Sequence, residues 1–282
     1  MTVGIVGLGL IGGSLAKAFR KYTDHRVLGY DVNPTVTQYA QMTDCIDGVL
    51  DKTTIAECEL VLLAVYPQAT VDYLAEMADV IADGTVVIDC GGIKRSICDR
   101  CREIEKDHGW IFIGGHPMAG LHHSGLKYAK ADLYVGASMI LTPKNTDDIA
   151  LLEKVTNWLR SIGFGSVTVT TPAQHDEIIA FTSQLAHVVS NAYVKSPRAK
   201  VHRGFSAGSY RDLTRVARLN EVMWTELFLE NKDNLIQEID HIIGSLQEYR
   251  EALNDDDAVR LRALLKEGSD RKERIDSGDG EH

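Results

Sequence analysis

The chain has 282 residues, a length that favours two domains over one. Hydrophobic residues make up 44% of it, enough for large cores, and no apolar run reaches the length of a membrane span. The net charge of −10 and the pI of about 5.5 argue against nucleic acid as a partner. We expect no signal peptide, and five cysteines, an odd number, indicate reduced thiols in a cytoplasmic protein.

The opening residues have the pattern of a nucleotide-binding turn. An apolar strand, Val3 to Val6, is followed by Gly7-Leu8-Gly9-Leu10-Ile11-Gly12, which has the G-x-G-x-x-G spacing, and then by a helical stretch. Gly7 permits a sharp turn, Gly9 lets a pyrophosphate approach the backbone, and Gly12 lets the helix pack closely on the sheet. The helix N-terminus offers N–H groups to the phosphates. We therefore expect a dinucleotide site, with a purely structural turn as the alternative.

An acidic residue after the second predicted strand indicates which dinucleotide binds. The strand, residues 26–30, ends in Asp31, where a carboxylate can accept hydrogen bonds from an adenosine ribose. That carboxylate would repel a 2′-phosphate, and no arginine follows among residues 32–34, so NAD is favoured over NADP. The predicted cofactor-binding residues are Gly7, Leu8, Gly9, Leu10, Ile11, Gly12 and Asp31.

Strands and helices alternate through the next part of the chain. Further strands are predicted at 60–65, 85–89, 110–115, 138–142 and 166–170, with helices at 35–42, 69–81, from about 94 to 107, and 147–162. This alternation predicts an α/β fold, a Rossmann-type doubly wound and mostly parallel sheet, in a first domain of residues 1–171.

The pattern changes at Thr171-Pro172, after which no alternating strand is found. Helices are predicted at 172–194, 212–217, 221–230 and 231–253, with a glycine-containing basic loop between residues 195 and 211. We therefore expect an all-α second domain over residues 172–282. Its end, Ser269 to His282, is charged and contains glycine, which predicts a flexible, frayed tail.

His116 is the best candidate for chemistry from the residues alone. Ligands of open α/β sheets bind at the carboxyl ends of the strands. His116 directly follows a buried predicted strand, Pro117 restricts its backbone, and its titration range suits a proton acceptor near neutral pH. The alternative is a histidine that only satisfies local backbone groups.

A metal site is not expected. His116, His122 and His123 lack a carboxylate or cysteine at a usual ligand spacing. Cys98-x-x-Cys101 has no second pair, so these residues are interpreted as two thiols on one helix rather than as a zinc or redox site.

Several motifs, in one order along nearly the whole chain, resemble the prephenate/arogenate dehydrogenase family. Besides the glycine turn, they are Asp89-x-Gly91-x-x-Lys94, Gly114-Gly115-His116-Pro117-Met118-Ala119-Gly120, Ser124-Gly125, Ser183-x-x-x-His187, Asp212-Leu213-Thr214-Arg215 and Met223-Trp224-x-x-x-Phe228-Leu229-x-Asn231. The resemblance implies an NAD(P)-binding domain followed by a helical domain that forms a homodimer. It also implies oxidative decarboxylation of prephenate to 4-hydroxyphenylpyruvate in tyrosine biosynthesis, or of arogenate to tyrosine.

The resemblance implies roles for particular side chains. His116 matches the catalytic histidine, which accepts a hydrogen bond from the substrate hydroxyl and must be neutral to do so. Arg215 would hold a substrate carboxylate through its planar guanidinium, unless it pairs instead with Asp212 or another acid. His187 and Ser183, four apart on one helix face, would line the substrate pocket, although His187 could also be a core histidine.

One further position has two possible roles, and two others depart from the family pattern. Lys94 could act electrostatically on the substrate, although a lysine after a turn is usually solvated. Many relatives have serine where this chain has Gly92, so one hydrogen bond to substrate and nicotinamide is in doubt. Several relatives have an acid at the position of His122. Loss of that carboxylate in this chain should alter gating of the entrance and the pH dependence.

Two other functions compete with a prephenate dehydrogenase. A β-hydroxyacid dehydrogenase of the same two-domain plan would use a lysine on the first helix of the helical domain, where only Lys195, at the far end, is found. A dinucleotide-sensing module without catalysis would not depend on His116. The sequence leaves prephenate and arogenate open as substrates, and inhibition by tyrosine at the active site is a further hypothesis.

Overall fold

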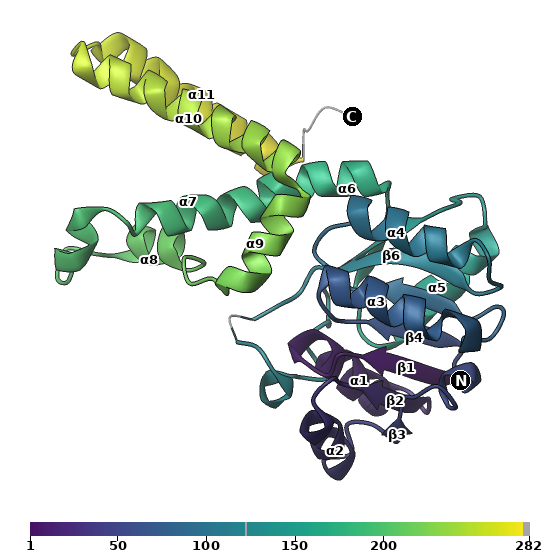
Figure 1. Cartoon of the computed structure of the whole chain (residues 1–282). Coiled ribbons are helices and arrows are strands. Elements are labelled where there is room, and N and C mark those ends of the chain that lie inside the picture. The colour runs from purple at the N-terminus through teal and green to yellow at the C-terminus, as the bar shows by residue number, and fades with distance from the viewer. Residues whose placement is uncertain (122, 279–282) are drawn as a thin grey trace. The chain divides into compact units, whose positions relative to one another are not determined.

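The strand order places the glycine-rich turn near the middle of one sheet. The computed structural model describes residues 1–121 and 123–278, so His122 lies outside the described residues. An eight-stranded sheet has the order β3-β2-β1-β4-β5-β6-β7-β8 (Figure 1). Its strands are β1 (Thr2–Val6), β2 (Arg26–Tyr30), β3 (Gly48–Val49), β4 (Leu60–Leu63), β5 (Val86–Asp89), β6 (Ile111–Pro117), β7 (Ser138–Pro143) and β8 (Ser166–Val169).

Only one strand pair of this sheet is antiparallel, β6 with β7. The central strands β4 and β5 are buried along their whole length, as expected for parallel strands covered on both faces. The predicted mostly parallel, doubly wound sheet is therefore confirmed. The two-residue β3 was not predicted, because a strand this short has no periodicity to detect.

Helices cover both faces of the sheet. On one face α1 (Leu10–Tyr22), α2 (Pro34–Met42) and α5 (Ile149–Ser161) pack on one apolar cluster, and α3 (Pro67–Met77) and α4 (Arg95–Glu105) pack on a second cluster on the other face. Short 3₁₀ turns lie between these elements: η1 (Ile55–Glu57), η2 (Ala78–Val80) and η3 (Leu126–Tyr128). The sheet's two faces are thus closed, and its carboxyl edge remains for a ligand.

A long helical run follows the sheet, with one irregular turn. It consists of α6 (Pro172–Ile179), a π-helical turn η4 (Ala180–Leu185) and α7 (Ala186–Tyr193), where the sequence predicted one uninterrupted helix. Thr171 caps its start by accepting from the Gln174 N–H. π turns inside helices occur frequently at functional sites.

The next helices differ from their predicted positions at one place. After the 3₁₀ segment η5 (Pro197–Val201), α8 (Gly208–Thr214) begins four residues before the predicted helix, and α9 (Glu221–Glu230) is as predicted. The start of α8 was missed because Ala207, at its N-cap, has no side chain that could cap it. The helix also ends at Thr214, three residues before the predicted end, so Arg215 lies just beyond α8 rather than inside a helix.

The chain divides into two compact units, Met1–Asn231 and residues 232 onward. The smaller unit is a pair of helices in contact, α10 (Lys232–Asn254) and α11 (Ala258–Ser277). Residues 172–231 belong to the larger unit, in which α6 and Asn231 contact α4. The domain boundary predicted after residue 171 stays a prediction. No helix within residues 1–121 and 123–278 is long and apolar enough to cross a bilayer.

The frayed tail predicted from Ser269 onward is wrong for residues 269–277, which form the end of α11. Asp257 caps the start of this helix, accepting from the N–H groups of Val259 and Arg260, and Gly278 ends it with a φ of 77°. The charged residues, which we interpreted as a sign of disorder, form ion pairs with partners four residues away. Such pairs stabilise helices; they are Lys266–Asp270, Glu267–Arg271 and Lys272–Asp276.

Candidate active site

The glycine-rich turn after β1 has the geometry of a phosphate cradle. Gly7 has a φ of +85°, and a Cβ there would lie 2.5 Å from Cγ1 of Val65. A Cβ on Gly12 would lie 1.9 Å from the carbonyl oxygen of Gly7, so the helix start can contact the turn only without a side chain. A Cβ on Gly9, in contrast, would meet no atom within 4 Å. Gly9 is the N-cap of α1 and supplies no capping side chain, which leaves the positive helix end open to an anion.

Asp31 is held beside this turn by backbone hydrogen bonds. Its Oδ2 accepts from the Leu8 N–H at 2.9 Å, and its Oδ1 accepts from the Asn33 N–H at 2.9 Å. Each carboxylate oxygen has a further lone pair that can accept from a ribose hydroxyl. The structure thus brings together the predicted cofactor residues: the turn from Gly7 to Gly12 and Asp31.

Two glycines explain how His116 comes to lie at the carboxyl end of β6. A Cβ on Gly114 would be 2.2 Å from Thr142 Oγ1, and a Cβ on Gly115 would be 2.5 Å from the carbonyl oxygen of Asp89. Both distances are too short for any larger residue. The glycines therefore let β6 lie close to its neighbours and fix the backbone that leads into His116.

A buried carboxylate, Asp89 at the end of β5, supports this edge of the sheet. Its Oδ1 accepts from the Gly115 N–H at 3.1 Å, and its Oδ2 accepts from the Gly91 N–H at 2.9 Å. It also forms an ion pair with Lys94 Nζ, and both side chains are fully buried. The alternative of a solvated Lys94 is excluded, because its ammonium group is bound by Asp89 inside the protein. Its predicted role toward the substrate stays a prediction.

His116 is the first member of a line of hydrogen bonds that the sequence did not reveal. Its Nδ1 lies 2.9 Å from His175 Nε2, and His175 Nδ1 lies 2.7 Å from Asp176 Oδ1. Asp176 also accepts from the N–H groups of Lys94 at 2.7 Å and Arg95 at 2.8 Å. These two N–H groups are at the start of α4, so a carboxylate of α6 caps that helix. One sign of this line is present in the sequence, a His-Asp pair three residues after the proline that begins α6.

Burial and neighbouring charges set the protonation of this line. Burial, then the nearby His175 and the Lys94 cation, lower the pKa of His116 well below its usual range. Burial also lowers the pKa of His175, although its bond to Asp176 opposes this. Burial alone would raise the pKa of Asp176, but hydrogen bonds from His175 and the two N–H groups hold it below its usual value. At neutral pH both imidazoles are therefore neutral and Asp176 is a carboxylate.

Asn231 connects the same region to α9 and to the π turn. It is fully buried, and its Nδ2 donates to the Asp176 carbonyl and to Gln184 Oε1, both at 2.8 Å. Gln184 in turn donates to the Leu227 carbonyl at 3.0 Å, and Arg95 donates to Asn231 Oδ1 at 2.9 Å. These bonds fix the π turn against α9 and the start of α4.

Two residues predicted to line the substrate pocket lie on neighbouring turns of this helical run: Ser183 on the π turn and His187 on α7. His187 donates from Nδ1 to the Ser183 carbonyl at 2.8 Å, and its ring lies against Trp224 with centroids 4.0 Å apart. Gly92, on the turn after β5, faces α9, since a Cβ there would lie 3.5 Å from Leu227. A serine at position 92 would thus meet ordinary van der Waals contact.

Arg215 lies at the end of α8, exposed, and no ion pair to it is found in the described part of the chain. Asp212, its possible partner from the sequence, is 4.0 Å from Arg211 instead. α8 packs on α7, and Asn191 of α7 donates to the Ala217 carbonyl at 3.0 Å. The segment that carries Arg215 is thus held against α7, the helix that contains His187.

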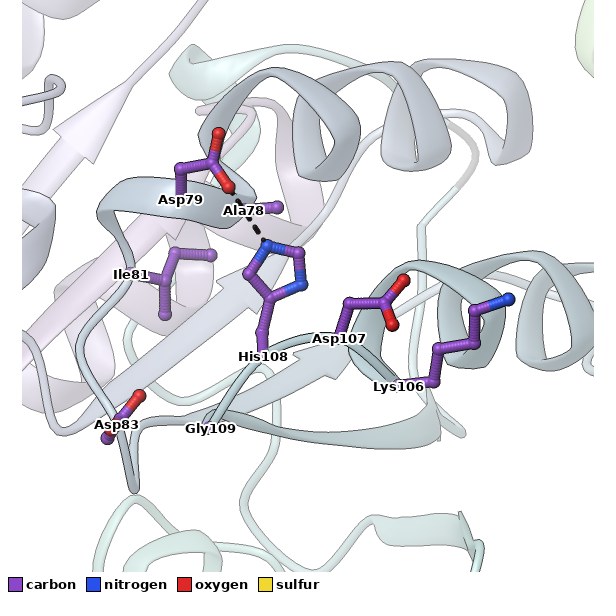
Figure 2. Close-up of a pocket in the computed structure, with 8 residues that line it drawn as sticks. All are labelled: Ala78, Asp79, Ile81, Asp83, Lys106, Asp107, His108 and Gly109. Atoms are coloured by element: carbon purple, nitrogen blue, oxygen red, sulfur yellow. Dashed lines mark hydrogen bonds and ion pairs between the residues drawn. The ribbon is translucent and has the colours of Figure 1, made fainter.

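A separate hollow of about 470 Å³ lies at the opposite edge of the sheet, before β5 and β6 (Figure 2). Its charged lining consists of three carboxylates, Asp79, Asp83 and Asp107, and one cation, Lys106. His108 also lines it, and its ring nitrogens lie 2.8 Å from the Ile104 carbonyl oxygen and 3.1 Å from Asp79 Oδ1. The three carboxylates outnumber the one lysine, which makes the hollow unfavourable for an anionic ligand.

The cysteines are buried or partly buried thiols. Cys98 and Cys101 lie on α4, as the two-thiols interpretation expected, and burial raises the pKa of Cys98 to about 11. No group of three potential metal ligands is found among residues 1–121 and 123–278.

Comparison with known proteins shows which family the chain resembles. The model of the prephenate dehydrogenase nucleotide-binding domain matches residues 15–168, and that of the prephenate dehydrogenase dimerization domain matches residues 171–267. Prephenate dehydrogenase of Bacillus subtilis is 30% identical over 96% of this chain and 75% of its own. Cyclohexadienyl dehydrogenase of Zymomonas mobilis is 32% identical over 94% of this chain and 92% of its own.

Solved structures show the same architecture. Prephenate dehydrogenase from Aquifex aeolicus, in complex with hydroxyphenyl propionate and NAD+, superposes with a TM-score of 0.83 at 28% identity and covers 98% of each chain. Synechocystis arogenate dehydrogenase superposes with a TM-score of 0.82 at 25% identity, over 98% of this chain and all of the other. The resemblance expected from the motifs is confirmed: the chain belongs to the prephenate dehydrogenase family.

Proposed function

We propose that the chain catalyses the NAD-dependent oxidative decarboxylation of prephenate to 4-hydroxyphenylpyruvate, a step of tyrosine biosynthesis. The observation that supports this most is a neutral His116 at the carboxyl edge of a Rossmann-type sheet, with its Nδ1 bound to His175. The imidazole Nε2 is then the atom that can accept a proton from a substrate hydroxyl.

The turn from Gly7 to Gly12 and Asp31 would hold the cofactor. The open space at Gly9 and the uncapped start of α1 fit a pyrophosphate, and Asp31 fits an adenosine ribose while disfavouring a 2′-phosphate. When bound, NAD supplies the acceptor for the hydride that leaves the ring carbon bearing the hydroxyl.

His116 handles the proton of the reaction. As the carbon loses hydride, Nε2 of His116 takes the hydroxyl proton, and the oxygen becomes keto-like. The ring carboxylate then leaves as carbon dioxide, its bonding electrons enter the ring, and the ring becomes aromatic. His116 returns the proton to the oxygen, which yields the phenol. Proton and charge therefore balance without a further acid or base.

The remaining predicted residues surround the substrate in this proposal. His187 and Ser183, which share a hydrogen bond, line the side-chain end of the pocket, and Gly92 leaves room beside Leu227 for substrate or water. Lys94 acts at a distance, because its buried cation is bound to Asp89 and lowers the pKa of His116. Arg215 holds a substrate carboxylate.

The first test of this function is a direct assay. Purified protein with NAD should form NADH on addition of prephenate, and the same assay with arogenate decides between the two substrates. The relatives include both a cyclohexadienyl and an arogenate dehydrogenase, so arogenate is the second candidate. Confirmed NAD binding without NADH formation from either compound would exclude the proposed reaction.

Arg215→Lys is expected to raise KM for prephenate about 10- to 100-fold, because a lysine cannot form the two parallel hydrogen bonds of a guanidinium. Arg215→Ala should raise it at least as much, with the KM for NAD unchanged. Arg160→Ala, at an exposed position in the last turn of α5, serves as the control and should behave like wild type. A KM for prephenate that stays within twofold in both Arg215 variants would remove this residue from the site.

The exposed apolar side chains of the helical segments support a homodimer. Phe205 is 91% exposed, and Val222 and Leu229 of α9 are exposed as well. Such side chains in number indicate a protein interface. The matching dimerization-domain model supports a second copy of this chain as the partner. The reduced state of all five cysteines supports a cytoplasmic location.

A further inference from the structure

The ionic state of Asp176 determines where the protons of the neighbouring histidines lie. Its carboxylate accepts from the backbone N–H groups of Lys94 and Arg95, and these bonds keep it ionised. An ionised carboxylate can only accept hydrogen bonds. His175 Nδ1, 2.7 Å from Asp176 Oδ1, must therefore bear a hydrogen.

The same reasoning passes from His175 to His116. His175 is buried and neutral, so with a hydrogen on Nδ1 its Nε2 has a lone pair and can only accept. His116 Nδ1, 2.9 Å away, must then be the donor, which leaves the lone pair of His116 on Nε2. We propose that His175 and Asp176 are positioning residues that hold His116 in the one tautomer able to accept a proton at Nε2.

This inference rests on the proposed function, in which Nε2 of His116 is the base. After His116 takes a proton, the added charge stays beside the His175 lone pair, with the Asp176 carboxylate next along the line. The other charges facing this region are the Lys94 cation, which opposes the added charge, its partner Asp89, and the Arg95 guanidinium near Asp176. Asp176 thus offsets part of the repulsion from Lys94.

Asp176 also ties the tautomer to the position of a helix. The N–H groups it accepts from begin α4, directly after the turn that contains Gly92. A displacement of α6 from α4 would break the hydrogen bonds that cap α4. It would at the same time separate His175 from His116. For this reason Asp176 itself is a poor site for a test, since its replacement would disturb the fold.

Two substitutions at His175 separate the two hydrogen bonds of its ring. The amide of His175→Asn can replace Nδ1 and donate to Asp176, but it is too short to reach His116. The amide oxygen of His175→Gln can replace Nε2 and accept from His116 Nδ1. We expect kcat to fall about 100-fold in the asparagine variant, within the range of general-base catalysis. In the glutamine variant kcat should be at least about tenfold higher than in the asparagine variant. KM for NAD should not change.

The matched control is Glu177→Gln, which alters an exposed acid next to Asp176 on α6 and should leave kcat unchanged. Thermal melts identify any variant that is not folded. The proposal is overturned if the folded asparagine variant keeps wild-type kcat, or if the glutamine variant is as impaired as the asparagine one.

A ¹⁵N spectrum of the histidine rings tests the tautomer without substrate. In the wild-type protein His116 should show a protonated Nδ1 and an unprotonated Nε2, and His175→Asn should shift the population toward protonated Nε2. A wild-type His116 protonated at Nε2 would overturn the positioning role even if prephenate is turned over. Conversely, absence of turnover would overturn the proposed function while the spectrum still decides the tautomer.

Discussion

Replacement of His116 by alanine is expected to lower kcat about 10²- to 10⁴-fold, the usual contribution of a positioned general base. NAD binding should persist, because the glycine turn and Asp31 are held by contacts that do not involve His116. Stopped-flow or steady-state formation of NADH measures the loss, and titration of cofactor fluorescence measures binding. A dinucleotide sensor, in contrast, would be indifferent to this substitution.

The pH dependence of kcat/KM is a second test of the role of His116. His116 acts as a neutral base, so activity is present above its pKa and is lost as the pH falls through it. Burial and the neighbouring His175 and Lys94 lower that pKa, so the acid limb of kcat/KM should lie below the ordinary histidine range. His108→Ala, at the opposite edge of the sheet, is the matched histidine control and should change neither kcat nor the limb. An acid limb within the usual histidine range would contradict the assigned environment.

Local patterns were sufficient to predict most of the sheet and the nucleotide turn. The run Leu60–Leu63 and the strand that ends at Asp89 are buried on both faces, so their apolar composition alone marks them. The spacing of the glycines follows from contacts between residues near in sequence, such as Gly12 with Gly7. Such short-range requirements leave a readable signature.

The site was only partly predictable because its bonds join distant segments. His175 bonds to His116, which is 59 residues away in the sequence. Asp176 bonds to the N–H group of Lys94, at the start of α4, which is 82 residues away. No periodicity encodes such a contact. The partner of Lys94 was missed for a different reason: Asp89 is only five residues away, but a lysine after a turn is normally solvated, and its burial depends on the packing of α4.

The end of the chain shows the opposite error. Charged residues from Ser269 onward resembled a disordered tail by composition, but the signs of the charges alternate at a spacing of four, which supports a helix. The capping residue Asp257 was a further signal. Composition counts charges, whereas helix stability depends on their order.

Replacement of Lys94 by methionine should be the most destabilising single change near the site. The Asp89 carboxylate would remain fully buried with two N–H donors but without its cation, and such uncompensated charges cost about 3–5 kcal/mol. Thermal unfolding should shift down on the order of 10 °C. Lys106→Met, an exposed lysine directly after α4, should melt with wild type.

A double variant and a pH profile separate the structural effect of Lys94 from its effect on catalysis. Asp89→Asn combined with Lys94→Met removes both charges, so it should be more stable than Lys94→Met alone, since the buried pair is replaced by neutral groups. In both variants loss of the Lys94 cation raises the pKa of His116, and the acid limb of kcat/KM should move to higher pH. A double variant as unstable as Lys94→Met would show that methionine packs poorly at this position rather than that Asp89 lacks its cation. An acid limb that does not move would show that the buried cation is too well neutralised by Asp89 to act on His116.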